Sequence, residues 1–511
     1  MRRMLSWLIC CALLLLTIPG WSEVTLPRLF SDHAVLQREA PIHIWGWASP
    51  NEHVTVEFHG QKQSAVAGRL GQWSLFLMPE HAGGPYSLTV QGANTITLND
   101  VLVGDVWFAS GQSNMEFPLN GFPGSAVLKN GAEEIAHADH PEMRLLHVGR
   151  KSSEYPLEDQ DGSWTASTPA TAATFSAVAY FFGREIQQQE HVPIGLIDST
   201  WGGTPAEAWV SLDGLAADAS LMPVFRARAQ MIKNQAEADR VVAEEKAEDA
   251  AARQANQPLP KHSWHPDPAS WSPAGLYNGM IAPEIRFTIK GVIWYQGESN
   301  SRAELAPLYS RLFPALISDW RQKWDEGNFP FLFVQISSFK STPAESWGII
   351  RDAQRRTLDL TNTAMAVTLD VGDPDNVHPP DKQTVGHRLA LAARAVAYGE
   401  PVEYSGPLFR QATSEGDSLR VWFDHAAGLT ARGTLQGFEV AGPDRRFETA
   451  TARIDGKTVV VTAPGVPSPA YVRYAWTNAP AENLYNGDGL PASTFTSEAA
   501  PAPPCAEACG H

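Results

Sequence analysis

The hydrophobic pattern changes character twice along this chain of 511 residues. Between residues 23 and 103, short runs of alternating or β-branched residues are separated by Gly and Pro. Alternation with a period of two predicts half-buried strands, and the intervening residues favour turns. We therefore expect this segment to form a small β-sandwich. Its clearest predicted strands are 42–47, 54–58 and 86–90.

Between residues 104 and 400 the pattern becomes one of continuous apolar runs alternating with helical periodicity. Continuous runs fit strands that are buried on both faces, and alternation with helices is typical of a parallel sheet covered by helices. The sequence thus predicts an α/β core. Its clearest strands are 193–198, 291–295, 331–335 and 364–369.

Short strand patterns return over residues 401–497, which predicts a C-terminal β-rich region. Its predicted strands are 419–423, 438–440, 458–461 and 471–474. The last residues, 498–511, are rich in Ala and Pro, and we expect a flexible tail.

An insertion interrupts the predicted core at about 215–275. Residues 225–257 are rich in Ala, Glu, Gln, Lys and Arg, which predicts one long, largely exposed helix. The loop that follows, 258–273, is rich in Pro, Trp and His. Long irregular loops inside α/β domains are often functional, so we expect this loop to border the mouth of the active site.

The N-terminus has the pattern of a secretory signal. Arg2 and Arg3 precede an apolar run over 5–18, and Gly20-Trp21-Ser22 provides a small-x-small cleavage site. The run is too short to span a bilayer comfortably. We predict a signal peptide over 1–22, a periplasmic or extracellular protein, and no stable membrane association after cleavage. An uncleaved anchor is the alternative.

The composition is that of a globular protein, with 43% hydrophobic and 19% charged residues. The formal net charge is −17, and removal of the two signal arginines makes it −19, which argues against nucleic acid or anionic membranes as partners. No spacing typical of a metal or cofactor site is present, so neither is expected. Cys505 and Cys509 remain in the tail, where their pairing is open, and the oligomeric state cannot be read from the sequence.

A serine follows one of the predicted core strands. Ser113 comes just after the strand at 105–109, in Gly-Gln-Ser-Asn-Met-Glu. Loops at the carboxyl ends of strands are where α/β proteins build active sites. Alone, such a serine is more often a turn residue or a helix cap.

A candidate base lies in a later loop. Asp375 precedes His378 by three residues, a spacing that lets the carboxylate bind Nδ1 and leaves Nε2 facing a serine. The spacing alone is weak, because it occurs by chance in many proteins. Asp370 and Asp373 lie close by, but neither has the same spacing.

Two further loops offer donors for an oxyanion. Gly202 and Gly203 follow the strand that ends near residue 198, and paired glycines let backbone N–H groups approach a ligand. Gln296 follows the strand at 291–295, and its amide can donate a hydrogen bond. Four polar loops, each after a buried strand, would thus supply the nucleophile, base, orienter and donors of a serine hydrolase.

Taken together, six segments resemble successive blocks of the sialate O-acetylesterase family, which belongs to the SGNH (GDSL-type) hydrolases. The resemblance covers nearly the whole mature chain, and the serine and Gln-Gly-Glu blocks are the most specific. The segments are 29–38, 111–116, 201–204, 294–300, 375–379 and 484–493.

The resemblance implies an SGNH-type three-layer α/β/α core and a role for each matched residue. Ser113 would be the nucleophile, His378 the general base and Asp375 its orienter. The oxyanion hole would combine the Ser113 N–H, an N–H of Gly202 or Gly203, and the Gln296 side chain, at a position where many SGNH relatives carry asparagine. Further positioning or substrate-binding candidates are Asn114, Trp201, Glu298 and Asn300.

The implied activity is hydrolysis of O-acetyl esters on sugars. The acidic charge favours a neutral glycan, such as acetylated xyloglucan or xylan, over an anionic one. A 9-O-acetyl sialic acid is the alternative substrate, and its carboxylate would want an arginine clamp, for which Arg302 and Arg351 are candidates. Two other hypotheses remain: an SGNH lipase or thioesterase, and a non-catalytic carbohydrate-binding protein.

Overall fold

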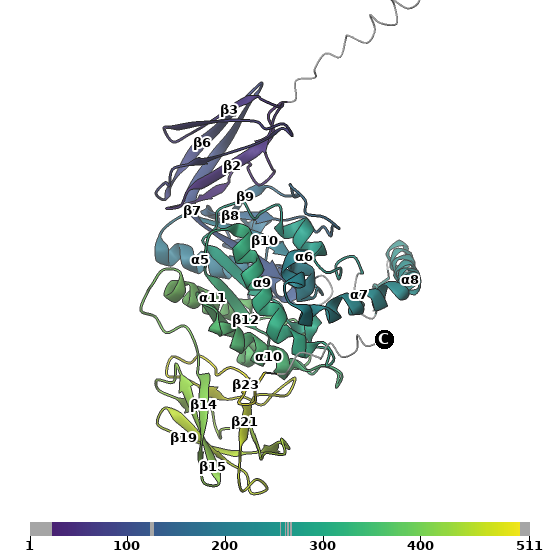
Figure 1. The fold of residues 1–511 in the computed structure, drawn as a ribbon, viewed down its shortest axis with the longest axis vertical. Coiled ribbons are helices and arrows are strands. Elements are labelled where there is room, and N and C mark those ends of the chain that lie inside the picture. The colour runs from purple at the N-terminus through teal and green to yellow at the C-terminus, as the bar shows by residue number, and fades with distance from the viewer. Residues whose placement is uncertain are drawn as a thin grey trace, which may run out of the picture.

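The computed structural model describes residues 23–122, 127–255, 257–260, 262, 265 and 268–500. The predicted signal segment, Cys505 and Cys509 lie outside these residues. Three units follow one another along the molecule, with a β-rich unit at each end of an α/β core (Figure 1). Over the described part of the chain, no helix is both long and apolar enough to cross a membrane.

The N-terminal unit consists of two small sheets around one apolar core. One sheet pairs β2 with β5, and the other contains β3, β4 and β6 and continues into the core strand β7. Burial alternates along β5, as the period of the sequence predicted. The predicted strands are confirmed. The bounds are β1 Val35–Gln37, β2 Ile42–Trp47, β3 His53–Phe58, β4 Gln61–Val66, β5 Gln72–Leu77 and β6 Gly83–Gln91.

One long strand joins this unit to the core. β7 (Thr95–Gly111) runs antiparallel to β6 at its start and parallel to two core strands at its end. It crosses the predicted boundary at 103/104 without a break. At Gly104 an added Cβ would lie 2.0 Å from the Pro193 carbonyl oxygen, so only glycine fits where β7 enters the core sheet.

The core sheet has the order β13-β12-β11-β7-β10-β8-β9. Neighbours pair in parallel except for the edge strand β9, which is antiparallel to β8. The predicted parallel sheet is therefore confirmed with one correction, because it is mixed at one edge. The bounds are β8 His140–His147, β9 Trp164–Ser167, β10 Ile194–Thr200, β11 Gly291–Tyr295, β12 Phe331–Gln335 and β13 Thr363–Val367.

Helices cover both faces of this sheet. Trp107 and Phe108 are consecutive on β7, so their side chains point to opposite faces. Trp107 contacts Phe182 of α5 (Ala177–Glu190), which packs against α11 (Lys382–Val396). Phe108 contacts Trp320 of α9 (Tyr309–Trp324), which packs against α10 (Trp347–Arg356). The result is a three-layer core.

The predicted long helix of the insertion is two helices. α7 (Pro223–Lys233) and α8 (Gln235–Gln254) are separated at Asn234, whose φ of −100° and ψ of 9° are not helical. Asparagine readily leaves helical geometry because its side chain competes for backbone hydrogen bonds. α8 projects away from the core (Figure 1). The shorter helices are α2 Ser113–Glu116, α3 Gly131–Ala136, α4 Pro169–Ala172 and α6 Leu212–Ala216.

The C-terminal unit contains two four-stranded antiparallel sheets and one strand pair, as its short strand patterns predicted. Arg351 of α10 ties this unit to the core, since its buried guanidinium donates to the carbonyl oxygens of Ala475 and Thr477. Arg351 is thus structural and is not the carboxylate clamp considered above. The bounds are β14 Leu408–Glu415, β15 Ser418–Asp424, β16 Thr430–Ala431, β17 Phe438–Ala441, β18 Glu448–Thr449, β19 Thr451–Asp455, β20 Thr458–Thr462, β21 Tyr471–Tyr474, β22 Leu484–Tyr485 and β23 Phe495–Thr496.

Candidate active site

The structure brings the predicted nucleophile and base together. Ser113 Oγ and His378 Nε2 lie 2.8 Å apart, although 265 positions separate the two residues in the sequence. Ser113 opens α2 directly after β7, and His378 lies in the loop between β13 and α11. Gly111 makes the turn possible, because its φ is +134° and an added Cβ would lie 2.2 Å from the Tyr295 carbonyl oxygen.

A cavity of about 670 Å³ opens beside this pair. Its volume suits a small ligand, and aromatic rings form much of its wall. Trp271, from the loop predicted to border the active site, is among them. The aromatic residues are Phe122, Trp201, Trp271, Phe339 and Trp347; the charged ones are Glu116, Arg150, Glu298, Arg302 and Glu345.

His378 is held in an apolar environment. Its ring lies 5.2 Å from that of Phe122 and 6.4 Å from that of Phe117, and its backbone N–H donates to Asn376 Oδ1 at 2.9 Å. Burial, assisted by the positive charge of Lys382, lowers the pKa of His378 to about 4. The imidazole is therefore neutral at pH 7, as a general base must be.

Asp375 does not take its predicted place. Its carboxylate is 80% exposed and pairs with Lys340 Nζ at 3.0 Å, and no described hydrogen bond joins it to His378. The hydrogen bond from the Asp375 N–H to Asp373 Oδ1, at 2.9 Å, helps fix this turn. The spacing of three residues allowed the contact with the imidazole, but the local turn directs the carboxylate outward.

Asn114 connects the nucleophile loop to the histidine loop. Its Nδ2 donates to Glu298 Oε1 at 2.6 Å and to the Val377 carbonyl oxygen at 3.0 Å. Its Oδ1 accepts from Lys382 Nζ at 2.5 Å. Asn114 thus fixes the residue next to His378, as one of its two predicted roles requires, whereas Glu298 both binds Asn114 and lines the cavity, so positioning and substrate binding both stay predictions for it.

Lys382 was not found by sequence reasoning. It is fully buried, which lowers its pKa to about 7, and its Nζ lies over the rings of Phe117 and Tyr295. Burial also raises the pKa of Glu298. No motif marks a buried lysine, since most lysines at a helix start are exposed.

The predicted oxyanion donors need two corrections. The Gln296 amide is fully buried and donates to the Thr204 carbonyl oxygen at 3.2 Å and to Asn300 Oδ1 at 2.7 Å, away from the cavity. The Gly202 N–H donates to Glu116 Oε2 at 2.5 Å. Asn300, also buried, donates to Glu207 Oε2 at 2.8 Å and is structural.

Two of the predicted donors stay available. Within the described residues, the N–H groups of Ser113 and Gly203 have no hydrogen-bond acceptor, and both residues line the cavity. Sequence reasoning could not choose between the two glycines, and the contact of Gly202 with Glu116 now favours Gly203. Glu116 also pairs with Arg150, and it was missed although it closes the Gly-Gln-Ser-Asn-Met-Glu segment.

The sequence of this chain is similar to those of known proteins of one family. Residues 262–395 match the family model described as carbohydrate esterase, sialic acid-specific acetylesterase. The sialate O-acetylesterase of Rattus norvegicus is 32% identical to this chain. The alignment runs over 524 residues, gaps included, and covers 91% of this chain and 92% of the relative. The chain belongs to the sialate O-acetylesterase family. The Homo sapiens sialate O-acetylesterase is 35% identical over 422 residues, 74% of this chain and 72% of the relative.

A solved structure agrees with this assignment. The crystal structure of a novel carbohydrate acetylesterase from Xanthomonas citri matches with a TM-score of 0.79 and 39% identity, and covers 93% of this chain and 100% of that one. This esterase is therefore a hydrolase of ester bonds with carbohydrate or sialate O-acetylesterase activity.

Proposed function

We propose that this esterase removes acetyl groups from plant hemicelluloses, such as xyloglucan and xylan, or from their oligosaccharides. The observation that carries the proposal is the 2.8 Å contact between Ser113 and His378 at the wall of an aromatic-lined cavity. Aromatic faces suit the apolar faces of sugar rings while their edges remain polar. The crystallised relative named a carbohydrate acetylesterase supports a glycan substrate.

The proposed reaction passes through an acetyl-enzyme. Ser113 Oγ attacks the acetyl carbonyl while His378 Nε2 takes the hydroxyl proton. The N–H groups of Ser113 and Gly203 stabilise the tetrahedral oxyanion. The protonated His378 then gives its proton to the departing sugar oxygen. A water molecule, deprotonated by His378, attacks the acetyl carbonyl on Ser113; the bond to Ser113 Oγ then breaks, Oγ takes the proton back from His378, and acetate leaves.

The charges of the cavity bear on the substrate. Three carboxylates, from Glu116, Glu298 and Glu345, face two guanidinium groups, and one of these, Arg150, is already paired with Glu116. This balance supports a neutral glycan. The sialate alternative has one specific observation in its favour, since Arg302 forms no ion pair with any described residue.

The choice of substrate is tested by acetate release from acetylated xyloglucan, acetylated xylan and 9-O-acetyl sialic acid. We expect a higher kcat/KM for a neutral glycan, and little change on it in Arg302→Ala. A preference for the sialate that disappears in Arg302→Ala would instead establish the alternative, because only a carboxylate needs the guanidinium. The panel also includes esters of increasing acyl length. A preference for acetyl esters over longer acyl chains would exclude the lipase hypothesis.

Secretion is part of the proposal. It is supported by the charged start, apolar run and cleavage pattern of residues 1–22. N-terminal sequencing of the protein recovered outside the cytoplasm should give a chain that begins near Glu23. A retained segment would favour the uncleaved anchor.

Asp375→Asn should lower kcat by less than about tenfold, because the carboxylate contacts Lys340 at the surface and not His378. Lys340→Ala, the other half of this exposed pair, is the matched control and should behave alike. A triad aspartate would cost about 10⁴ in kcat through the wrong imidazole tautomer. A loss of that size in Asp375→Asn alone would show that the loop rearranges to bring Asp375 onto His378.

The acid limb of the pH profile should lie near pH 4. His378 acts as a base only when neutral, and its pKa of about 4 keeps it neutral above that pH. Activity should therefore fall as the pH drops through about 4, measured as kcat/KM with circular dichroism to confirm folding. Lys382→Met should move the limb upward, because removal of a nearby positive charge raises the histidine pKa. A wild-type limb near 6.5 would contradict the buried environment.

A further inference from the structure

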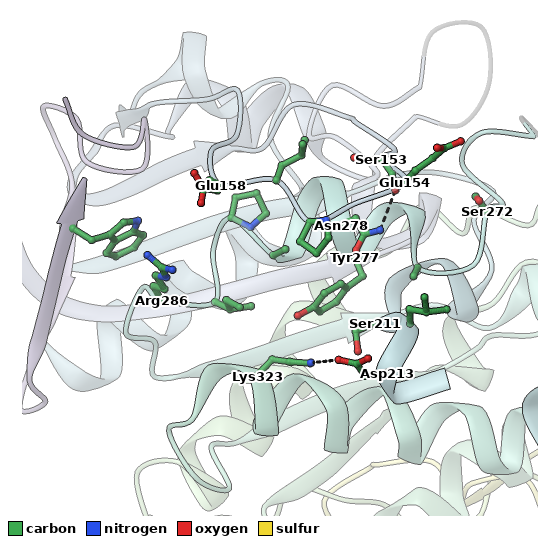
Figure 2. A pocket seen from close by; sticks show the side chains of 18 of the residues that line it. Ser153, Glu154, Glu158, Ser211, Asp213, Ser272, Tyr277, Asn278, Arg286 and Lys323 are labelled. Carbon is green, nitrogen blue, oxygen red and sulfur yellow. Dashed lines mark hydrogen bonds and ion pairs between the residues drawn. The ribbon is translucent and has the colours of Figure 1, made fainter. Parts of the chain in front are cut away.

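A second cavity lies where the N-terminal unit meets the core. Its volume is about 720 Å³, and it shares no lining residue with the catalytic cavity. Trp45 to Trp47, at the end of β2, form one wall, and the loop around residues 153–158 forms another. Figure 2 shows this cavity and the polar residues around it, including Tyr277, Arg286 and Asn278. The established ester hydrolysis assigns no role to any of them.

Two polar side chains of this cavity have no partner among the described residues. Tyr277 is 3% exposed as a whole residue, and its hydroxyl makes no hydrogen bond to a described residue. In Figure 2 it points into the cavity, between Arg286 and the pair of Lys323 with Asp213. Arg286 likewise forms no ion pair within the described structure. The Tyr277 hydroxyl is open to the cavity, where it can both donate and accept, so it is free to bind a ligand or water there.

The backbone at Tyr277 is specialised. Residues Tyr277–Ile281 form a π-helical turn, in which the Ala282 N–H donates to the Tyr277 carbonyl oxygen at 2.8 Å. Gly279 packs so closely on the loop that an added Cβ would lie 2.0 Å from the Lys151 carbonyl oxygen. Such turns are rare and often lie at functional sites. This turn places Tyr277 and Asn278 side by side on the wall.

The charges of the wall favour a neutral ligand. Three carboxylates, of Glu154, Glu158 and Asp213, face the two cations Arg286 and Lys323. Lys323 and Asp213 neutralise each other at 2.8 Å. The cavity thus has no excess of positive charge that would bind a phosphate or a carboxylate. It offers instead planar polar groups and an indole.

The indole is held in place by the loop opposite. Trp47 is half-buried, and its Nε1 donates to Glu158 Oε2 at 3.3 Å. The Asn278 Nδ2 donates to the Ser153 carbonyl oxygen at 3.1 Å, and among the described residues no donor binds its Oδ1, which leaves an acceptor on a residue that lines the cavity. A fixed aromatic surface beside hydroxyl, amide and guanidinium groups is the combination that a polyhydroxylated ring can use.

The second cavity adjoins the catalytic one. Arg150 lines the catalytic cavity and Ser153 the second, and three residues span at most about 11 Å. Trp271 lines the first and Ser272, the next residue, lines the second. The two segments are bonded together, since the Ser153 N–H donates to the Gly275 carbonyl oxygen at 3.0 Å. A thin double wall thus separates the cavities.

We propose that this second cavity is a non-catalytic binding site for a neutral saccharide, and that it holds a sugar segment of the same glycan whose acetyl group enters the catalytic cavity. The identity of the glycan rests on the function proposed above. The site itself does not, because it is defined by residues that take no part in the chemistry. Binding there would lower KM for oligosaccharides without affecting small esters, which cannot reach both cavities at once.

The test combines Tyr277→Phe and Arg286→Ala. The first removes one hydroxyl from a nearly isosteric ring, and the second changes an exposed side chain, so both should fold; thermal unfolding checks this. Arg446→Ala, at an 89% exposed arginine of the C-terminal unit, is the matched control. We expect each cavity variant to weaken binding of deacetylated xyloglucan or xylan oligosaccharides by about two- to tenfold, measured by calorimetry, as for one lost hydrogen bond.

Kinetics provide the second readout. The double variant should raise KM for acetylated oligosaccharides at unchanged kcat, and should hydrolyse a small aryl acetate like the wild type. Unchanged oligosaccharide affinity and KM in the double variant would overturn the proposed site, as would binding of an anionic sugar there in preference to neutral ones. Oligosaccharide binding that depends on Tyr277 and Arg286, without any acetate release, would refute the hemicellulose proposal and leave this site standing.

Discussion

Ser113→Ala should lower acetate release by about 10⁴ to 10⁶, because it removes the atom that forms the acetyl-enzyme. The substitution deletes one oxygen at the start of α2, where the only hydrogen bond given for Ser113 Oγ among the described residues is the one to His378. The fold and the cavity should therefore be unchanged. Acetate release from the preferred glycan and from an aryl acetate measures the effect, with glycan binding as evidence of an intact site.

Ser299→Ala is the matched control for this experiment. Ser299 lines the same cavity, and its described contact there is made by its backbone N–H, which donates to Gln112 Oε1 at 3.2 Å. Loss of its hydroxyl should leave most of the activity. If Ser113→Ala kept more than a few per cent of turnover, the assignment of the nucleophile would be wrong. Absence of release from all substrates, with binding retained, would favour a non-catalytic carbohydrate-binding protein.

Much of the fold was predictable because buried strands have a strong local signature. β11 and β12 coincide with the predicted runs at 291–295 and 331–335, since their residues are apolar on both faces. The path of β7 was not predictable, because the half-buried and the fully buried parts of one strand resemble two separate strands. The break between the two helices at Asn234 was not predicted. Helix propensity was judged over a long segment, and one residue of low propensity changes that sum little.

The candidate site was also predictable only in part: the positions of its residues could be predicted, but the directions of their side chains could not. The positions of Ser113, His378 and Trp201 follow from the strand ends that carry them, and the strand order brings those ends together. Side-chain direction does not follow from strand order. Gln296 and Asp375 both lie in the predicted loops, yet one points into the core and the other to the surface. A motif places a residue, whereas competing hydrogen bonds decide where its side chain points.

The electrostatic environment could not be read from the sequence at all. Lys382 and Glu298 are separated by more than 80 residues and meet through Asn114. The low pKa of His378 depends on burial by aromatic rings and on the charge of Lys382, so it is a property of the packed structure. The sequence predicted a base, and the packing sets the pH at which that base works.

His378→Ala should also lower kcat by about 10⁴ to 10⁶, because Ser113 would lose the acceptor for its proton. The two residues act as one unit in a single proton transfer, so their losses should not multiply. We expect the double variant Ser113→Ala/His378→Ala to be no slower than either single variant, within the error of acetate measurement at high enzyme concentration. A double variant slower by the product of the two losses would mean that the residues contribute independently, which a shared proton transfer across 2.8 Å does not allow. The comparison therefore tests the mechanism itself, beyond the importance of either residue.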